Sequence, residues 1–252
     1  MPPHLSIVLP FYNEEACVAQ VIVDLDTALK PASFTYEMVA VQNGSRDRTG
    51  EILAGLKADH PTLRIVEVPV NQGFGYGLIQ GMAASAGDIV GFMPGDGQID
   101  PAVIAPLLKK MEECGADVAQ GRRITRGDGW LRWLISKSFN LLARLLFTLP
   151  TPDINGHPKL MRRRCYEALD LRSPDSFLDA EILLKGQKMG ARFCHLDLEF
   201  RRRETGRSSV RISTCLEFVQ NLMKARFMKE DPWGLHRTPP RKLALAQKEE
   251  AL

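Results

Sequence analysis

The stretch DIVGFMPGDGQIDP, residues Asp88–Pro101, is an apolar run that stops abruptly at a short polar turn. Residues Ile89–Met93 predict a short interior strand. The glycines of the turn permit tight turning, and Asp96 and Gln98 offer hard oxygen atoms of the kind that bind Mg²⁺ or Mn²⁺ beside a diphosphate. All of these residues are also ordinary turn formers, so for this segment by itself a plain loop is the simpler interpretation.

Strands and helices are predicted to alternate around this segment. The expected strands are Leu5–Leu9, Tyr36–Val41, Leu63–Val68, Ile89–Met93 and Asp117–Gln120. The expected helices are Glu14–Leu29, Arg48–Lys57, Gly75–Ala86 and Ala102–Cys114. Such alternation is typical of the α/β class, with a mainly parallel sheet that helices cover on both faces.

Polar, turn-rich segments follow the first four expected strands. They are PFYNE (Pro10–Glu14), QNGS (Gln42–Ser45), NQGFGYG (Asn71–Gly77) and PGDGQ (Pro94–Gln98). In an open parallel sheet ligands bind beyond the carboxyl ends of the strands, so these four corners should lie together. Each corner by itself is compatible with a helix cap or a turn, and the glycine-rich corner lacks the dinucleotide spacing G-x-G-x-x-G. Together they favour a nucleotide site, because base, ribose and diphosphate need contacts from several loops.

Composition excludes several classes of protein. The 252 residues, 44% hydrophobic and 25% charged, fit one large domain or a domain with an appendage. A net charge of +3 is too small to indicate nucleic acid as a partner, whereas local arginine clusters favour anion binding. Five cysteines without paired spacing indicate a reducing compartment and no zinc site. Because no long apolar run and no signal-peptide pattern is present, we expect a protein that is neither secreted nor membrane-spanning.

Four longer segments carry a family resemblance. They are LSIVLPFYNEE (5–15), VAVQNGSRDRTGEI (39–52), VNQGFGYGLIQGMAASAGDIVGFMPGDGQIDP (70–101) and GRRITRGDGWLRWLISKSFNLLARLLF (121–147). In this order they resemble family-2 glycosyltransferases, most strongly the polyprenyl-phosphate (dolichyl-phosphate) sugar transferases. The likeness runs from about Leu5 to Arg211, and several motifs at their expected spacings are more specific than any one of them. It implies a GT-A fold, which is a Rossmann-like α/β fold, and a nucleotide-sugar donor.

The resemblance implies roles for the residues of the corners. Asp96 and Gln98 match the pair that holds the metal, Mg²⁺ or Mn²⁺. The first two corners match segments that line the nucleotide pocket, and Arg203 matches a basic loop that contacts the donor diphosphate. With the third corner added, the donor-binding candidates are Pro10, Tyr12, Glu14, Asn43, Asn71, Gly73, Asp96 and Arg203.

The second half of the chain resembles the acceptor region of these enzymes. Arg123, Arg132 and Ser136 match positions that bind a lipid phosphate, although ordinary surface charge is the competing interpretation. Residues 130–149, WLRWLISKSFNLLARLLFTL, have the spacing of an amphipathic helix that lies on a membrane, packs on the core or forms a dimer interface. Asp179 and Glu181 match the place of a proton-accepting carboxylate in enzymes that use a sugar hydroxyl, and they also suit helix capping.

Two motifs depart from the family pattern. Gln42 and Asn43 stand where relatives usually have paired aspartates, and Pro94 stands where they have the first aspartate of an Asp-x-Asp motif. A carboxamide can still bond a base or ribose, but a missing carboxylate weakens the attraction for a divalent ion. We therefore expect a lower metal affinity than in these relatives.

The sequence thus predicts an inverting, metal-assisted transferase that moves a hexose-type sugar from a nucleotide diphosphate to a polyprenyl phosphate. The catalytic candidates are Asp96, Arg123, Asp179 and Glu181. One alternative is transfer to a saccharide hydroxyl of a surface polysaccharide or glycolipid. The other is a catalytically weakened subunit that binds nucleotide sugars.

Domain organisation and location follow from the same resemblance. We expect a GT-A domain over residues 1–211, with a nucleotide-sugar half up to about 121 and an acceptor half over 122–211. Residues 212–252 are expected to form a C-terminal amphipathic helix and a mobile tail. A lipid acceptor implies a cytoplasmic protein that binds peripherally to the cytoplasmic face of the membrane, and a homodimer is compatible with the apolar helix.

Overall fold

The computed structural model describes residues 1–125, 143, 146–147, 149–151, 153–200, 212–227 and 232–235. Its strands are β1 (Leu5–Phe11), β2 (Tyr36–Asn43), β3 (Leu63–Val68), β4 (Ile89–Phe92), β5 (Val118–Thr125), β6 (Lys159–Arg162) and β7 (Phe193–Glu199). Its helices are α1 (Val18–Leu29), α2 (Thr49–Leu56), α3 (Phe74–Ala84), α4 (Ile104–Glu113), α6 (Arg163–Leu169), α7 (Leu178–Lys188) and α8 (Ile212–Phe227), with a 3₁₀ turn, η1 (Pro101–Val103), before α4.

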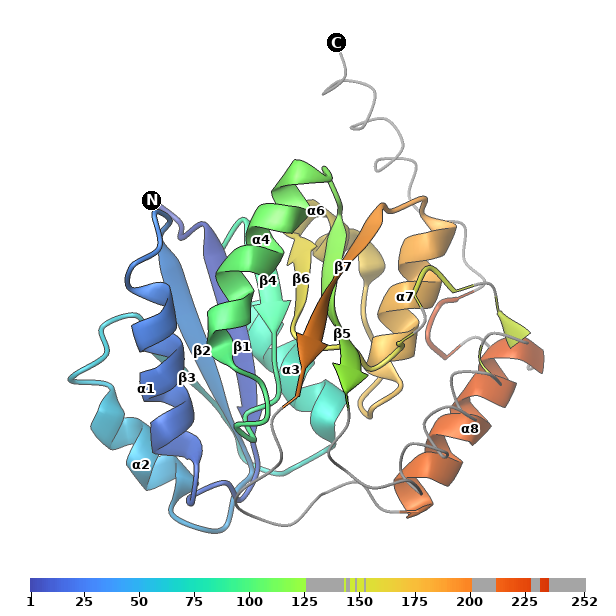
Figure 1. Ribbon diagram of the computed structural model, residues 1–252. Coiled ribbons are helices and arrows are strands. Elements are labelled where there is room, and N and C mark those ends of the chain that lie inside the picture. The colour runs from blue at the N-terminus through green and yellow to red at the C-terminus, as the bar shows by residue number, and fades with distance from the viewer. Residues whose placement is uncertain are drawn as a thin grey trace.

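The strands form one 7-stranded sheet in the order β3-β2-β1-β4-β6-β5-β7 (Figure 1). Neighbouring strands are parallel except that β6 is antiparallel to both β4 and β5. This mainly parallel sheet confirms the predicted α/β class. Because β6 runs in reverse between β4 and β5, it begins at the edge of the sheet where those two strands end.

Most expected elements of the first 120 residues are present with slightly shifted ends. Helix α1 begins at Val18 instead of Glu14, because Asn13 has a positive φ of 55° and the chain turns before the helix starts. Strand β5 continues to Thr125 instead of Gln120, because it pairs with β7 along that extension. Strands β6 and β7 were not expected, since their partners lie far away in the sequence.

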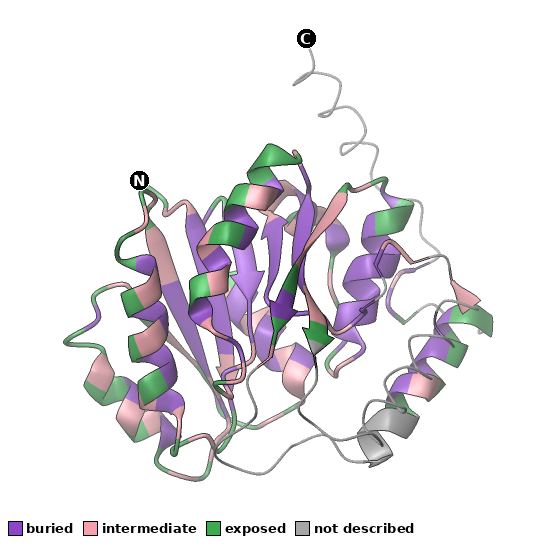
Figure 2. Ribbon diagram, in the orientation of Figure 1, coloured by how far each residue is buried: buried purple, intermediate pink, exposed green. Residues whose placement is uncertain are grey.

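The strands in the middle of the sheet consist largely of buried residues (Figure 2), and their apolar side chains belong to two separate clusters. In β1, Ile7 and Leu9 join a buried cluster with α1 and α4, whereas Val8 joins a cluster with α3, α6 and α7. Strand β1 is therefore covered on both faces, which explains why its sequence is a nearly continuous apolar run instead of an alternating one. The predicted two-sided covering of the sheet is confirmed.

A third cluster joins the C-terminal helix to the rest of the protein. Phe218 and Leu222 of α8 pack with Phe177 and Leu183, and the ring of Phe177 lies 4.6 Å from that of Trp233. The described residues from the end of the predicted amphipathic helix, at 143, 146, 147 and 149, pack against this same cluster. Within the described parts of the chain, no helix is long and apolar enough to cross a membrane.

A buried carboxylate, Asp26 of α1, joins helix to sheet on the side away from the corners. It accepts a hydrogen bond of 2.7 Å from the Tyr36 hydroxyl, and its other oxygen lies 2.7 Å from His60 Nδ1 and 3.0 Å from Lys30 Nζ. Burial by itself would raise the pKa of Asp26, but these three partners outweigh it and lower the pKa to about 2.

We predict that Asp26→Asn destabilises the protein by about 1–3 kcal/mol at pH 7, because it removes the charge that these partners bind. Since the folded pKa of about 2 lies below the ordinary value of 3.8, this contribution is complete above pH 4 and is lost as the pH falls towards 2. Urea unfolding of both proteins at pH 7 and pH 3 measures it. An equal stability gap at both pH values would contradict the assignment.

Candidate active site

The predicted corners lie at one edge of the sheet. Phe11 pairs with Gln42 and Asn43 pairs with Val68, so β1, β2 and β3 end side by side. Strand β5 runs in the same direction as β4 on the far side of β6, which brings Arg123 to this edge as well (Figure 1). The carboxyl ends of five strands therefore gather the described donor-site candidates and the acceptor-site candidate Arg123.

Three residues that are candidates for binding the nucleotide-sugar donor lie between β2 and α3, where Asn43 and Asn71 both bond Gly73. The Asn43 side chain is buried, and its Nδ2 donates a hydrogen bond of 3.1 Å to the carbonyl of Gly73. Asn71 Oδ1 accepts one of 2.8 Å from the Gly73 N–H. The bond from Asn43 Nδ2 to Gly73 fixes the orientation of the Asn43 amide. Asn43 Oδ1 is then a buried acceptor that has no hydrogen-bond partner among the described residues. Gln42, in contrast, folds back onto its own turn and accepts from the N–H of Gly44.

The first corner is joined to the second by hydrogen bonds between their backbones and side chains. The Glu14 N–H donates to Thr49 Oγ1 at 2.9 Å, and the Asn13 N–H donates to Ser45 Oγ at 3.1 Å. Pro10 lies in β1, and the Tyr12 side chain is exposed. These contacts hold the segment with Pro10, Tyr12 and Glu14 beside the end of β2.

The corner after β4 carries the two metal candidates. Asp96 Oδ1 accepts the Gln98 N–H at 3.2 Å, and Gly97 between them adopts a φ of +72°. Within the described residues no group of three or more His, Cys, Asp or Glu side chains is positioned to hold a metal. One carboxylate and one carboxamide nevertheless fit Mg²⁺ or Mn²⁺, since Mg²⁺ is commonly bound through one or two carboxylates together with substrate phosphates and water.

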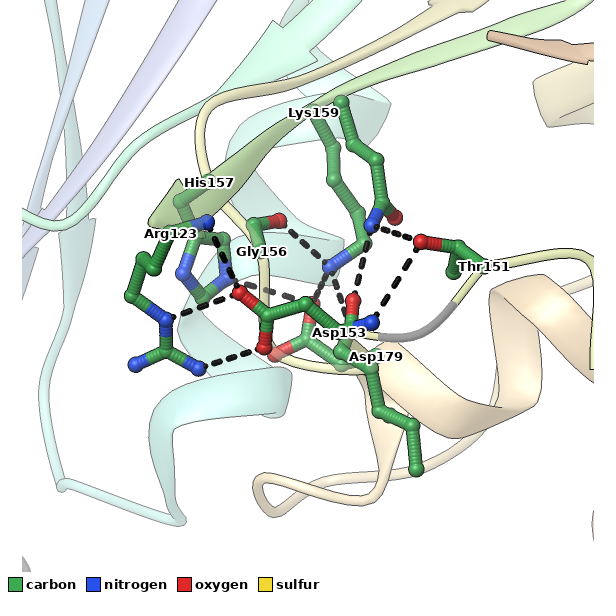
Figure 3. Close-up of polar contacts among 9 residues, drawn as sticks. Arg123, Thr151, Asp153, Gly156, His157, Lys159 and Asp179 are labelled. Carbon is green, nitrogen blue, oxygen red and sulfur yellow. Dashed lines mark hydrogen bonds and ion pairs between the residues drawn. The ribbon is translucent and has the colours of Figure 1, made fainter. Parts of the chain in front are cut away.

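Arg123 at the end of β5 forms a two-pronged ion pair with Asp153. Its Nε and Nη2 donate to the two carboxylate oxygens at 2.9 and 2.7 Å, and its backbone N–H donates at 3.1 Å (Figure 3). Burial would raise the pKa of Asp153, but the guanidinium of Arg123 outweighs it and lowers that pKa. The planar guanidinium has five N–H donors, so this pair orients the group and leaves donors for a second anion.

A second buried ion pair lies beside the first. Lys159 Nζ donates to Asp179 Oδ1 at 2.5 Å, and His157 Nε2 lies 3.1 Å from the same oxygen (Figure 3). Burial would raise the pKa of Asp179, but His157 and Lys159 outweigh it and lower the pKa to about 2. Burial outweighs the neighbouring carboxylate of Asp179 and lowers the pKa of His157. Asp179 is thus the counter-ion of a buried ammonium group.

Glu181, two residues further along α7, serves a different part of the structure. It accepts hydrogen bonds from the backbone N–H groups of Arg172 and Ser173 and from Lys185 Nζ. The loop held in this way packs on the glycine-rich corner, where the Pro174 carbonyl accepts the Tyr76 N–H at 2.8 Å. Asp179 and Glu181 therefore do not face a common point, and Glu181 supports the donor corner through that loop.

Sequence reasoning missed Asp153 and Lys159 as members of the site. Lysine in a short apolar strand was a usable signal, because Lys is seldom buried unless it is paired. Three predicted site residues, Arg132, Ser136 and Arg203, lie outside the described residues. So do most of the predicted helix 130–149 and all of the predicted mobile tail beyond Asp231 except residues 232–235.

The sequence matches the family model for glycosyl transferase family 2 over residues 6–170, and the chain therefore belongs to this family. It is 27% identical over 230 residues to a dolichol-phosphate mannosyltransferase of Pyrococcus furiosus, which covers 87% of this chain and 63% of that protein. It is 30% identical over 168 residues to an undecaprenyl-phosphate 4-deoxy-4-formamido-L-arabinose transferase of Pseudomonas paraeruginosa, which covers 66% of this chain and 49% of that protein. The chain thus spans about half to two thirds of the length of these relatives.

Solved structures share the fold. A mannosyltransferase of Pyrobaculum calidifontis, solved with GDP-Man and Mn²⁺, has a TM-score of 0.69 at 20% identity over 94% of this chain and 69% of that chain. A glucosyl-3-phosphoglycerate synthase of Mycobacterium tuberculosis, solved with Mn²⁺, UDP and glucosyl-3-phosphoglycerate, has a TM-score of 0.67 at 21% identity over 88% and 79%. The predicted GT-A fold is confirmed by this likeness.

We predict that Gly73→Ala destabilises the protein by about 1–3 kcal/mol, because Gly73 has a φ of +118° and an added Cβ would lie 2.3 Å from the Pro174 carbonyl oxygen. Gly55→Ala in α2 is the control, since nothing lies within 4 Å of its added Cβ. It should stabilise the helix by about 0.5–1 kcal/mol. Urea unfolding compares them, and equal effects would refute the tight packing of this corner.

Proposed function

We propose that this chain is an inverting glycosyltransferase that moves a sugar from a nucleotide-diphosphate sugar to a polyprenyl phosphate. A phosphate oxygen of the acceptor forms a bond to the anomeric carbon from the side opposite the leaving group. The bond from that carbon to the nucleotide diphosphate breaks, and the diphosphate leaves with the electron pair. The acceptor is already an anion, so no general base is needed to create the nucleophile.

The state of Asp179 is the observation that carries this choice of acceptor. Transfer to a saccharide hydroxyl requires a base, and an efficient base has a pKa near the working pH. The pKa of Asp179 is lowered to about 2, and its Oδ1 contacts Lys159 and His157. Glu181 is buried and bonded to two backbone N–H groups and to Lys185. Neither carboxylate is therefore suited to act as a general base. This favours an acceptor, such as a phosphate, that is already an anion and needs no deprotonation.

The names of two curated relatives support the same acceptor. The Pyrococcus furiosus and Pseudomonas paraeruginosa proteins are named as transferases that use dolichol phosphate and undecaprenyl phosphate. Both acceptors carry a phosphate group on a polyprenyl chain, so an enzyme that uses them needs a group that binds phosphate, such as an arginine. Arg123 fits this role, because its charge is delocalised and its orientation is set by Asp153.

The remaining residues take their roles from their positions at the sheet edge. We assign nucleotide binding to the corners after β1, β2 and β3, and we assign the acceptor phosphate to Arg123 together with Arg132 and Ser136. Asp96 and Gln98 would hold Mg²⁺ or Mn²⁺, and Arg203 would contact the donor diphosphate. When bound by these two side chains, the ion would supply positive charge to offset the negative charge on the leaving diphosphate.

A polyprenyl phosphate is embedded in a membrane, so we propose peripheral binding to the membrane surface. The amphipathic pattern of residues 130–149 is the segment of the sequence that suits this contact. Because the nucleotide sugar is a water-soluble cytoplasmic compound, the cytoplasmic face is the proposed location. Co-sedimentation with vesicles that contain polyprenyl phosphate tests the proposal, and an absence of binding would count against a lipid acceptor.

We predict that Asp96→Ala abolishes Mn²⁺-dependent binding of the donor, because it removes the carboxylate of the proposed metal site. Thermal-shift titration with UDP-, GDP- and dTDP-sugars, with and without Mn²⁺, measures this and names the donor. Asp100→Ala, in the same loop, is the control and should keep the shift. A donor that binds the wild type without any detectable sugar transfer would instead favour the weakened binding subunit.

A neighbouring arginine provides a matched pair for the acceptor site. We predict that Arg123→Lys raises the KM for polyprenyl phosphate by about tenfold or more, because lysine cannot bond Asp153 and a phosphate with one planar group. Arg122→Lys should leave this KM unchanged, since Arg122 bonds Asp197 on the adjacent strand at 2.6 Å. Steady-state kinetics with each substrate varied in turn measures both. Equal effects would indicate general charge attraction instead of a specific site.

A further inference from the structure

Lys159 occupies an unusual place for a charged residue. It is the first residue of β6, is 0% exposed, and pairs with Phe92 at the end of β4 and with Gln120 of β5. Since β6 is antiparallel to both neighbours, its start lies beside the end of β4, which leads into the loop with Asp96, and beside the part of β5 that precedes Arg123. A fully buried ammonium group therefore lies between the proposed donor and acceptor halves of the site.

All three N–H donors of this ammonium group have partners. Lys159 Nζ donates to the carbonyls of Ile154 and Gly156 at 2.9 and 2.8 Å, and to Asp179 Oδ1 at 2.5 Å (Figure 3). The carbonyls belong to the turn 153–157, and the carboxylate belongs to α7. One charged group thus fastens the turn to the helix.

The same turn is fastened to β5. Gln120 Nε2 donates to the Asp153 carbonyl at 2.7 Å, and the Gly121 N–H donates to the Pro158 carbonyl at 2.9 Å. The fit is close, because a Cβ added at Gly156 would lie 2.1 Å from the Gly121 carbonyl oxygen. Asp153, the first residue of the turn, then holds the guanidinium of Arg123.

We propose that Lys159, balanced by Asp179, is a positioning residue that sets the orientation of Arg123 through the turn 153–157. The inference rests on the proposed function in that Arg123 is the acceptor-phosphate ligand. Lys159 does not touch the acceptor. It fixes the carbonyls of Ile154 and Gly156, which follow Asp153 in the chain. Asp153 in turn bonds Nε and Nη2 of Arg123, so the other N–H groups of the guanidinium point in a fixed direction.

Stability alone does not account for this ion pair. Replacing a buried ion pair by apolar side chains of similar volume is often neutral or stabilising, so an apolar pair would serve packing equally well. An apolar side chain could not bond the carbonyls of Ile154 and Gly156. His157 ties the same turn to the donor half, because its ring lies 5.5 Å from that of Phe92. The ion pair thus fixes the orientation of the turn 153–157 at the boundary between the donor and acceptor halves of the site.

The test replaces both charges at once. Lys159→Met alone would leave Asp179 buried without its counter-ion, whereas Lys159→Met with Asp179→Leu removes both charges and keeps the volume. In ¹H–¹⁵N NMR spectra, the Nε–H of Arg123 should be protected in the wild type by its bond to Asp153. We expect its exchange to be about tenfold faster or more in the double variant, because the turn loses its anchor.

A matched control and a second variant keep this readout decisive. Lys185→Met with Glu181→Met removes another buried ion pair of the same region, in which the two side chains lie 2.6 Å apart, and should leave the Arg123 signal unchanged. If the double variant does not fold, Lys159→Gln with Asp179→Asn replaces it, as a neutral pair that can still form a hydrogen bond. Unchanged protection of Arg123 in a folded charge-free variant would overturn the inference.

Kinetics separates the inference from the proposed function. The double variant should raise the KM for polyprenyl phosphate by about tenfold and leave the donor KM unchanged, and it should add nothing further in an Arg123→Ala background. Fully additive effects would show that Lys159 does not act through Arg123. If the wild type transfers no sugar to polyprenyl phosphate, the proposed function fails, while the NMR measurement still decides the positioning role.

Discussion

The geometry of the candidate site depends on one buried ammonium group, that of Lys159. It lies at the start of β6, the strand that is antiparallel to both of its neighbours in the sheet. A buried charge is costly unless it is paired and hydrogen-bonded, so Asp179 and two backbone carbonyls must stay in place around it. That requirement fastens the turn 153–157 to α7, while Gln120 and Gly121 fasten the same segment to β5. Strand β6, which pairs with both β4 and β5, joins the ends of these two strands.

The need to pair buried cations also determines which acidic residues can take part in the chemistry. A carboxylate that neutralises a buried cation is held in its ionised form and cannot readily take up a proton, which describes Asp179. Asp153 is occupied in the same way by Arg123, whereas Asp96 lies on the loop at the other side of the site. The proposed function assigns the remaining chemistry to the binding of anions by arginine and of a cation by oxygen atoms. Both suit the transfer of a group between two phosphates.

Local sequence patterns predicted the parallel part of the fold well. Strand β3 was predicted residue for residue, and the polar corners after β1 to β4 lie at one edge as expected, because apolar periodicity and turn residues act over short distances. Strands β6 and β7 were missed. The strand KLMR is four residues long with a charge at each end, and it is stabilised by pairing with β4 and β5, not by its own propensity.

The sequence by itself determined the α/β class, the four corners and membership of the glycosyltransferase family, because these depend on local spacing and on motif order. Only the tertiary structure decided which charges meet. Arg123 and Asp153 are 30 residues apart, and Lys159 and Asp179 are 20 apart. Their pairing depends on the reversed strand β6 and on burial that raises the cost of any unpaired charge. Neither of these is encoded in the local pattern of the chain.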